Sequence, residues 1–296
     1  MKSRYRFFCF TLTFVLVLCT AAQVSGSTGT DEKKTVSSIV QMIPAAVDMK
    51  ETDGPGNLYA LSAVLMDGDS GRVLYEKEGY TARPNASTTK VMTCILALEK
   101  GSGDDYVMVS ENAASQPEVK LNLKEGEQYY LEDLLYSLML KSHNDTAVAI
   151  AEHIGGSVEG FAKMMNAKAK EIGCTNTHFV NPNGLNSDQQ YTTCRDMAKI
   201  AAAAFANQTL CQIDSTLSYK FPATKAAAAR TITPGHKMLY PNDSRYYAGI
   251  VGGKTGYTSK AGNTLVTCVE KDGVRMVAVI LKSKSTHYAD TKKMLD

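Results

Sequence analysis

Residues 58–66 are apolar on both faces of an extended chain and residues 72–77 alternate, short apolar runs return after residue 260, and apolar residues recur at helical spacing between these regions. Residues 58–66 and 72–77 predict a β-hairpin across an Asp-Gly turn, and residues 264–269 and 274–281 predict a second one. The helical pattern covers residues 87–98, 131–139, 147–154, 157–172 and 193–205. We therefore predict an α+β fold, in which an antiparallel sheet from both chain ends packs against helices from the middle.

Residues that favour helix ends sharpen this pattern. Ser157 and Thr193 are suited to cap the starts of two helices, Gly101 is suited to end the helix of residues 87–98, and Gly173 the one that Ser157 starts. The Thr193-x-x-Asp196 spacing is a variant of the capping box. After residue 210 the pattern predicts strands, and residues 288–296 predict a short final helix.

The first 26 residues have a different character. Lys2, Arg4 and Arg6 precede an uncharged apolar run over residues 7–19, and small residues follow. This order predicts a secretory signal peptide over residues 1–26, because the apolar run is too short to cross a bilayer comfortably. Residues 27–55 are polar and predict a flexible spacer, which leaves residues 56–296 as the catalytic domain. We expect an exported protein on the cell-wall side of the cytoplasmic membrane.

Composition and charge fit a soluble globular protein, with 44% hydrophobic and 21% charged residues in a chain of 296. The chain has 32 basic and 30 acidic residues, and removal of the three basic residues in the signal peptide leaves 29 against 30. A net charge near −1 gives no indication of nucleic-acid binding. The cysteines are irregularly spaced and contain no Cys-x-x-Cys, so the sequence predicts neither a disulfide framework nor a metal site, and no cofactor.

Ser87 and Lys90 carry the first candidate chemistry. Three residues apart at the start of an apolar helix, they lie on the same helical face. A lysine that is deprived of water can remove the proton from a serine hydroxyl and so make it a nucleophile. Roughly one Ser-x-x-Lys is expected by chance in a chain of this length, so a helix cap beside a solvated lysine is the alternative.

Two later motifs complete a known triple. Ser142-His143-Asn144 interrupts two apolar helices, where a loop can present side chains to a cleft. Lys254-Thr255-Gly256 precedes the final strands, and its glycine permits close approach of a ligand. Ser-x-x-Lys, Ser-x-Asn and Lys-Thr-Gly in this order are the signature of penicillin-binding proteins and serine β-lactamases.

From about Leu58 to Asp296 the chain resembles the D-alanyl-D-alanine carboxypeptidases, the low-molecular-mass penicillin-binding proteins. Longer stretches carry the resemblance beyond the three motifs, at residues 86–90, 109–114, 132–135, 151–156, 176–185 and 253–258. The resemblance implies the β-lactamase/transpeptidase-like fold. It also implies a peptidoglycan stem peptide ending in D-Ala-D-Ala as substrate, with β-lactam antibiotics as covalent inhibitors.

The resemblance assigns catalytic roles to Ser87, Lys90, Ser142 and Asn144. Ser87 attacks the carbonyl of the penultimate D-Ala, and Lys90 takes its proton. Ser142 passes a proton to the departing D-Ala amine, and Asn144 orients Lys90 and the substrate amide.

The resemblance also implies a substrate-binding strand at residues 254–257. Lys254 keeps the site positive, and Thr255 meets the terminal carboxylate beside Gly256. The backbone N–H groups of Ser87 and Tyr257 form the oxyanion hole.

Three features depart from the family pattern. His143 stands where a small residue is usual, and we expect its imidazole to point to solvent, with a second proton carrier as the alternative. His287 stands near the position of an arginine that helps to bind the substrate carboxylate, so it is a weaker, pH-dependent anchor. Many relatives continue into a β-rich domain and a membrane anchor, whereas this sequence stops at Asp296, as a minimal secreted form or an incomplete one.

Two rival functions share parts of this pattern. Class A β-lactamases have the same three motifs, but they add a deacylating glutamate, and residues 181–186 of this chain contain none. A catalytically silent wall-binding module is the other rival. Retention of all six polar motif residues argues against it.

Overall fold

The computed structural model describes residues 54–225 and 227–296. The predicted signal peptide and nearly all of the predicted spacer lie outside the described residues. No helix in the described ranges is long and apolar enough to cross a lipid bilayer.

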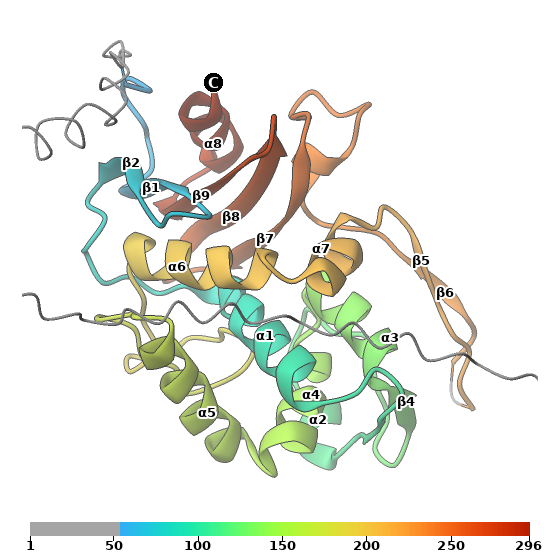
Figure 1. The fold of residues 1–296 in the computed structure, drawn as a ribbon. Coiled ribbons are helices and arrows are strands. Elements are labelled where there is room, and N and C mark those ends of the chain that lie inside the picture. The colour runs from blue at the N-terminus through green and yellow to red at the C-terminus, as the bar shows by residue number, and fades with distance from the viewer. Residues whose placement is uncertain (1–53, 226) are drawn as a thin grey trace, which may run out of the picture. The chain divides into compact units, whose positions relative to one another are not determined.

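Both ends of the described chain meet in one antiparallel sheet of five strands, in the order β2-β1-β9-β8-β7 (Figure 1). Strand β1 pairs with β9, with Val64 opposite Val279, so the first hairpin is joined directly to the last. This arrangement confirms the predicted α+β fold and both predicted hairpins. The strands are β1 (Ser62–Asp67), β2 (Val73–Lys77), β7 (Ile250–Thr258), β8 (Gly262–Lys271) and β9 (Val274–Ser283).

Helices cover both faces of this sheet. On one face, Val64 and Val279 pack into a large core that includes α6 (Cys194–Phe205). On the other face, Ala63 and Ile280 pack against the end of α8 (His287–Leu295). Successive side chains point to opposite faces of a strand. Burial on both faces therefore explains why β1 and β9 are apolar nearly throughout.

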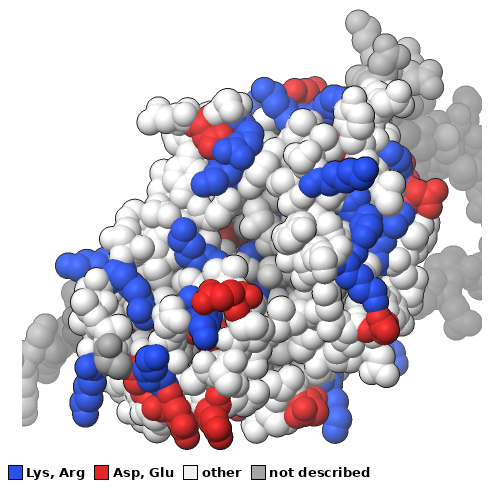
Figure 2. Space-filling view, turned by 180° about the vertical axis from the view of Figure 1, so that it is seen from behind, with Lys and Arg blue, Asp and Glu red and all other residues white. Residues whose placement is uncertain are grey.

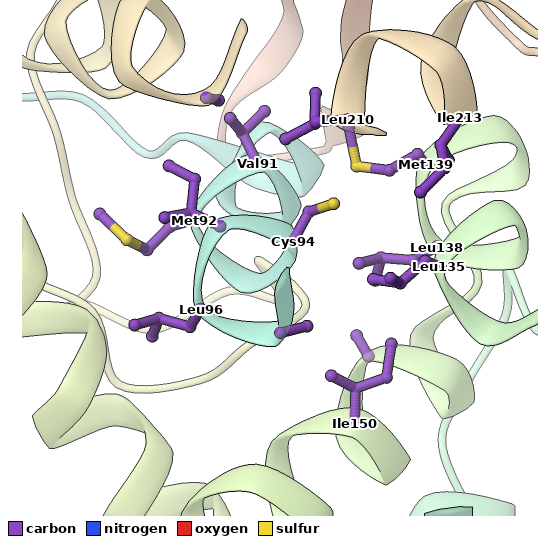
Figure 3. Close-up of a cluster of buried hydrophobic side chains, with 14 of the residues drawn as sticks. Val91, Met92, Cys94, Leu96, Leu135, Leu138, Met139, Ile150, Leu210 and Ile213 are labelled. Carbon is purple, nitrogen blue, oxygen red and sulfur yellow. The ribbon is translucent and has the colours of Figure 1, made fainter. Parts of the chain in front are cut away.

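Helix α1 (Lys90–Lys100) lies at the centre of the helical half, as Figure 3 shows. Its residues from Lys90 to Ala97 are all buried. Apolar side chains from three other helices surround it, including Leu138, Ile150 and Leu210. The surrounding elements are α3 (Leu131–Tyr136), the π-helix η3 (Ser137–Lys141), α4 (Asn144–Gly155), α5 (Val158–Glu171) and α7 (Gln208–Ser215).

The predicted helix starts are confirmed, and strands follow in the last third of the chain as predicted, but they begin later than residue 210. The side chains of Ser157 and Thr193 accept hydrogen bonds from backbone N–H groups and cap α5 and α6. After residue 210 the chain continues in helix α7, because Asn207 caps it and Leu210 and Ile213 face the core from one side. The remaining elements are β3 (Tyr106–Met108), α2 (Glu111–Ala114), β4 (Gln128–Tyr130), β5 (Tyr219–Phe221), β6 (Arg230–Ile232) and the short turn η4 (Lys237–Leu239).

Candidate active site

Ser87 lies in a single 3-10 turn, η2 (Ala86–Thr89), that runs directly into α1. The turn begins at Ala86, whose φ of 47° is a left-handed conformation that costs free energy for a residue with a side chain. The turn places Ser87 at the positive end of the α1 dipole and Lys90 one turn later on the same face. The predicted geometry of this motif is therefore present.

Lys90 is completely buried, and its amine lies among three oxygens. Its Nζ is 3.1 Å from Oγ of Ser87, 2.9 Å from Oδ1 of Asn144 and 2.7 Å from the carbonyl oxygen of Asn183. Burial lowers the pKa of Lys90 far below its usual value, and the positive charge of Lys254 lowers it further. The amine is therefore driven towards its neutral, basic form.

This arrangement suits a neutral amine, which has two N–H donors and one lone pair. The carbonyl of Asn183 can only accept, so it takes one N–H. The second N–H goes to Oδ1 of Asn144, whose Nδ2 donates to the carbonyl of Pro117 at 3.2 Å and so fixes the orientation of the amide. Nζ also donates to Oγ of Ser87, and a neutral amine with its two N–H groups on Asn183 and Asn144 can instead accept the hydroxyl proton through its lone pair. A base and its proton donor are thus held within hydrogen-bond distance.

The loop at residues 181–186 is part of the site, which the sequence alone did not show. Gly184 has a φ of 85°, and a Cβ at this position would overlap the carbonyl of Ala86. The loop therefore packs closely against η2 and brings the carbonyl of Asn183 to Lys90. The Asn183-Gly184 pair signals a tight turn, but it does not reveal which buried amine the preceding carbonyl meets. No described carboxylate is hydrogen bonded to Ser87 or Lys90.

Ser142 ends the π-helix η3 in a left-handed conformation, with a φ of 66°. A π-turn of this kind inserts an extra residue into a helix and often occurs at functional sites. The Oγ of Ser142 is buried, and no described residue is hydrogen bonded to it. Ser142 and Ser87 line the same cleft.

His143 does not point to solvent, so that prediction was wrong. Its ring is buried, and Nδ1 lies 2.8 Å from the hydroxyl of Ser137. Burial lowers the pKa of His143 to about 3, with a further contribution from the positive charge of Arg230. The ring therefore stays neutral at physiological pH, which argues against the alternative of a second proton carrier.

The Lys-Thr-Gly motif lies on β7, at the edge of the sheet, and passes directly beside η2. A Cβ at Gly256 would lie 2.8 Å from the backbone nitrogen of Ser87, so only glycine allows this approach without displacement. Tyr257 follows with 67% of its side chain exposed. The backbone at residues 256–257 and the N–H of Ser87 consequently lie at one point of the cleft.

Lys254, on this strand, is buried, and its Nζ donates to the carbonyl of Thr255 at 2.9 Å. Burial lowers the pKa of Lys254 to about 8, and the negative charge of Asp214 opposes this shift. Asp214, on α7, accepts a 2.6 Å hydrogen bond from the N–H of Gly253, and burial raises the pKa of its carboxyl to about 7. No sequence pattern pointed to Asp214 as part of the site.

The motifs converge on a cleft of about 490 Å³. His287, at the start of α8, lies in this cleft as expected, but its Nδ1 is buried without a hydrogen-bond partner among the described residues. Burial lowers the pKa of His287, and the positive charge of Arg245 lowers it further. Of the predicted site residues, those that line the cleft are Ser87, Ser142, Thr255, Gly256, Tyr257 and His287.

Comparison with known proteins agrees with this fold. Residues 20–285 match peptidase family S11, described as D-alanyl-D-alanine carboxypeptidase. The chain is similar to D-alanyl-D-alanine carboxypeptidase DacF of Bacillus subtilis, with 37% identity over 80% of this chain and 61% of the relative. This chain thus spans less than two thirds of that relative's length.

Solved structures show the same fold. The DD-transpeptidase of Streptomyces K15 is 28% identical to this chain, covers 82% of it and 98% of its own length, and has a TM-score of 0.76. A D-alanyl-D-alanine carboxypeptidase of Mycobacterium tuberculosis is 31% identical and has a TM-score of 0.73, with 82% of this chain and 90% of that chain covered. The architecture is thus that of the transpeptidases. The chain belongs to the D-alanyl-D-alanine carboxypeptidase family, peptidase family S11.

Proposed function

We propose that this protein is a serine D-alanyl-D-alanine carboxypeptidase, which removes the terminal D-Ala from peptidoglycan stem pentapeptides. The observation that carries the proposal is the fully buried Lys90 amine, 3.1 Å from Oγ of Ser87 and held by two oxygen acceptors. This geometry supports a nucleophilic serine with a neutral lysine as its base.

In the acylation step, Ser87 attacks the carbonyl carbon of the penultimate D-Ala while its proton passes to Lys90. The backbone N–H groups of Ser87 and Tyr257 stabilise the oxyanion, and the close approach of Gly256 to Ser87 supports this pairing. One such donor commonly contributes about 3 kcal/mol. The C–N bond then breaks, Ser142 passes a proton to the departing D-Ala amine, and an ester on Ser87 remains.

In the deacylation step, water attacks the ester and releases the shortened peptide and the free serine. A β-lactam acylates the same serine but keeps its leaving group attached, so hydrolysis is slow. Residues 181–186 present the carbonyl of Asn183 to Lys90 and contain no glutamate, which supports a peptidase over a class A β-lactamase.

The proposed setting is the cell-wall side of the cytoplasmic membrane. Residues 1–26 are proposed to act as a cleaved signal peptide and residues 27–55 as a spacer, with the catalytic domain at residues 56–296. The substrate partner is a stem peptide that ends in D-Ala-D-Ala, and no nucleic acid or metal takes part.

The first test compares wild-type protein, mature from about Ser27, with Ser87→Ala. Wild type should release D-Ala from a stem pentapeptide and form a covalent adduct with a fluorescent penicillin, and Ser87→Ala should do neither. A label that survives in Ser87→Ala contradicts the choice of nucleophile. Rapid penicillin turnover with little D-Ala release supports the β-lactamase, and wall binding without either activity supports the silent module.

A further inference from the structure

Arg245 lies in the loop between η4 and β7 and lines the same cleft as Ser87 and Thr255. The cleft is also lined by Lys141 and Lys237, and none of its described lining residues is Asp or Glu. Basic side chains likewise lie on several sides of the central hollow on the face that Figure 2 shows. A cleft with positive walls favours the anionic end of a ligand.

Two contacts hold the guanidinium of Arg245 in place. Its Nε and Nη2 donate to Oδ1 and Oδ2 of Asp243, each at 2.7 Å. The guanidinium carbon lies 5.3 Å from the centre of the Tyr288 ring, in the range of a cation–π contact. The side chain is 44% exposed and lines the cleft. Arg245 is thus positioned before any ligand binds, which reduces the entropy lost on binding.

The pairing with Asp243 leaves binding capacity unused. A guanidinium has five N–H donors, and Asp243 takes one from Nε and one from Nη2. Within the described ranges, the guanidinium makes no other hydrogen bond. The two N–H groups of Nη1 and the second one of Nη2 remain. One N–H from each of these two nitrogens can bind the two oxygens of a carboxylate.

His287 cannot supply this charge under ordinary conditions. Its pKa lies below the usual value because the ring is half-buried and Arg245 is close. A neutral imidazole can still donate one hydrogen bond, and Nδ1 of His287 is buried without a partner in the described part of the chain. The permanently charged guanidinium of Arg245 therefore lies in the same cleft as a neutral hydrogen-bonding ring.

We propose that Arg245 binds the C-terminal carboxylate of the substrate and so determines the preference for peptides with a free carboxyl end. Thr255 and His287 add hydrogen bonds to the same group. The charge for this contact thus comes from the loop before β7, and not from the first residue of α8. The inference rests on the proposed function, because it names what recognises the last residue of that substrate.

The test compares two peptides that differ only at their end, one finishing in D-Ala-D-Ala and the other in its C-terminal carboxamide. Arg245→Gln should lower kcat/KM about 10- to 100-fold for the carboxylate peptide, the loss typical of a charge-assisted pair, and change the carboxamide value little. Arg245→Lys keeps the positive charge but lacks the paired N–H groups. Its kcat/KM for the carboxylate peptide should lie between those of wild type and Arg245→Gln. Arg72→Gln, at an exposed arginine of the β1–β2 hairpin, is the matched control and should match wild type.

Equal losses for both peptides, or no loss, overturn the role of Arg245. Circular dichroism melting of each variant separates this result from misfolding. If wild type releases D-Ala from neither peptide, the proposed function fails, and Arg245 is then judged by binding alone. In that case the affinities of both peptides are measured for Ser87→Ala with and without Arg245→Gln. An unchanged ratio of these affinities refutes the inference.

Discussion

At the scale of single residues, burial gives Lys90 its proposed role as a base. A lysine on the surface is protonated at neutral pH, whereas this one is completely enclosed, and its pKa is far lower. The carbonyl of Asn183 and the amide of Asn144 satisfy its two N–H groups, so the neutral form is not left without partners. Burial destabilises the charged amine, so Lys90 is neutral and can accept the proton of Ser87.

Lys254 offers a test of this electrostatic arrangement through the pH profile. Lys254 is positive only below its pKa, which burial lowers to about 8, so we expect kcat/KM to fall as the pH rises through this value. The negative charge of Asp214 raises the pKa of Lys254. Asp214→Asn removes that charge and should move the alkaline limb to lower pH by about 1 unit. The measurement is D-Ala release between pH 6 and about pH 10.

Asp69→Asn is the control for this shift, because Asp69 pairs with Arg275 at the surface and lies outside the cleft. It should leave the alkaline limb unchanged. An alkaline limb that is the same in Asp214→Asn and wild type would show that Asp214 does not act on Lys254.

At the scale of elements, the site depends on two close backbone approaches to η2. Strand β7 comes near at Gly256, and the loop at residues 181–186 comes near at Gly184. The loop brings the carbonyl of Asn183 to Lys90. Strand β7 brings the backbone of the sheet edge to Ser87. The glycines matter here because any side chain would separate the elements.

Gly184→Ala should therefore impair function more than its backbone strain alone explains. Its Cβ would overlap the carbonyl of Ala86 and push the carbonyl of Asn183 away from Lys90. We expect at least a 10-fold slower penicillin labelling, roughly 1.4 kcal/mol in activation free energy. The assay is the rate of labelling of Ser87 by a fluorescent penicillin, with the melting temperature measured in parallel.

Gly126→Ala is a matched control for this variant. Gly126 has a φ of 77°, close to that of Gly184, but a Cβ there would meet no atom within 4 Å. The control therefore has the same strain without the overlap, and it should lower the melting temperature while labelling stays near the wild-type rate. Similar labelling rates in the two variants would contradict a specific role for the loop.

At the scale of the whole molecule, α1 connects the helical half to the sheet through α6, which packs on the strands. Its apolar residues contribute to the same core as Val64 and Val279 of the sheet, while its first turn carries the candidate nucleophile and base. The cleft lies where η2 meets the edge strand β7. Stability of the core and geometry of the site are consequently linked through one helix.

Leu96→Ala should lower the free energy of unfolding by about 2–5 kcal/mol, because Leu96 is buried in this core and its truncation leaves a cavity. Chemical denaturation followed by tyrosine fluorescence and by far-ultraviolet circular dichroism measures the loss. Both probes should give one coincident transition. Leu74→Ala, at a side chain of β2 that is 43% exposed, should change the free energy by less than about 0.5 kcal/mol. Equal losses in the two variants would contradict the central place of α1.

Much of this protein was determined by local sequence. The apolar periods gave α1, both hairpins and the antiparallel sheet, because burial on one or two faces imposes a period of 3.6 or 2. The order of the three short motifs gave the family and the residues around the cleft. Capping side chains such as Ser157 and Thr193 gave helix starts, because a cap acts within a few residues.

Only the tertiary structure decided which residues from distant segments of the chain meet at the site. Asn183, Asp214 and Arg245 reach the site from segments distant in sequence, and His143 is buried by neighbours that no local pattern reveals. The strands predicted after residue 210 begin only at β5, because residues up to Ser215 belong to α7, where packing outweighs weak local preference. The basicity of Lys90 belongs to this second group, since the pKa of an amine depends on the water and charges that the whole fold removes or brings near.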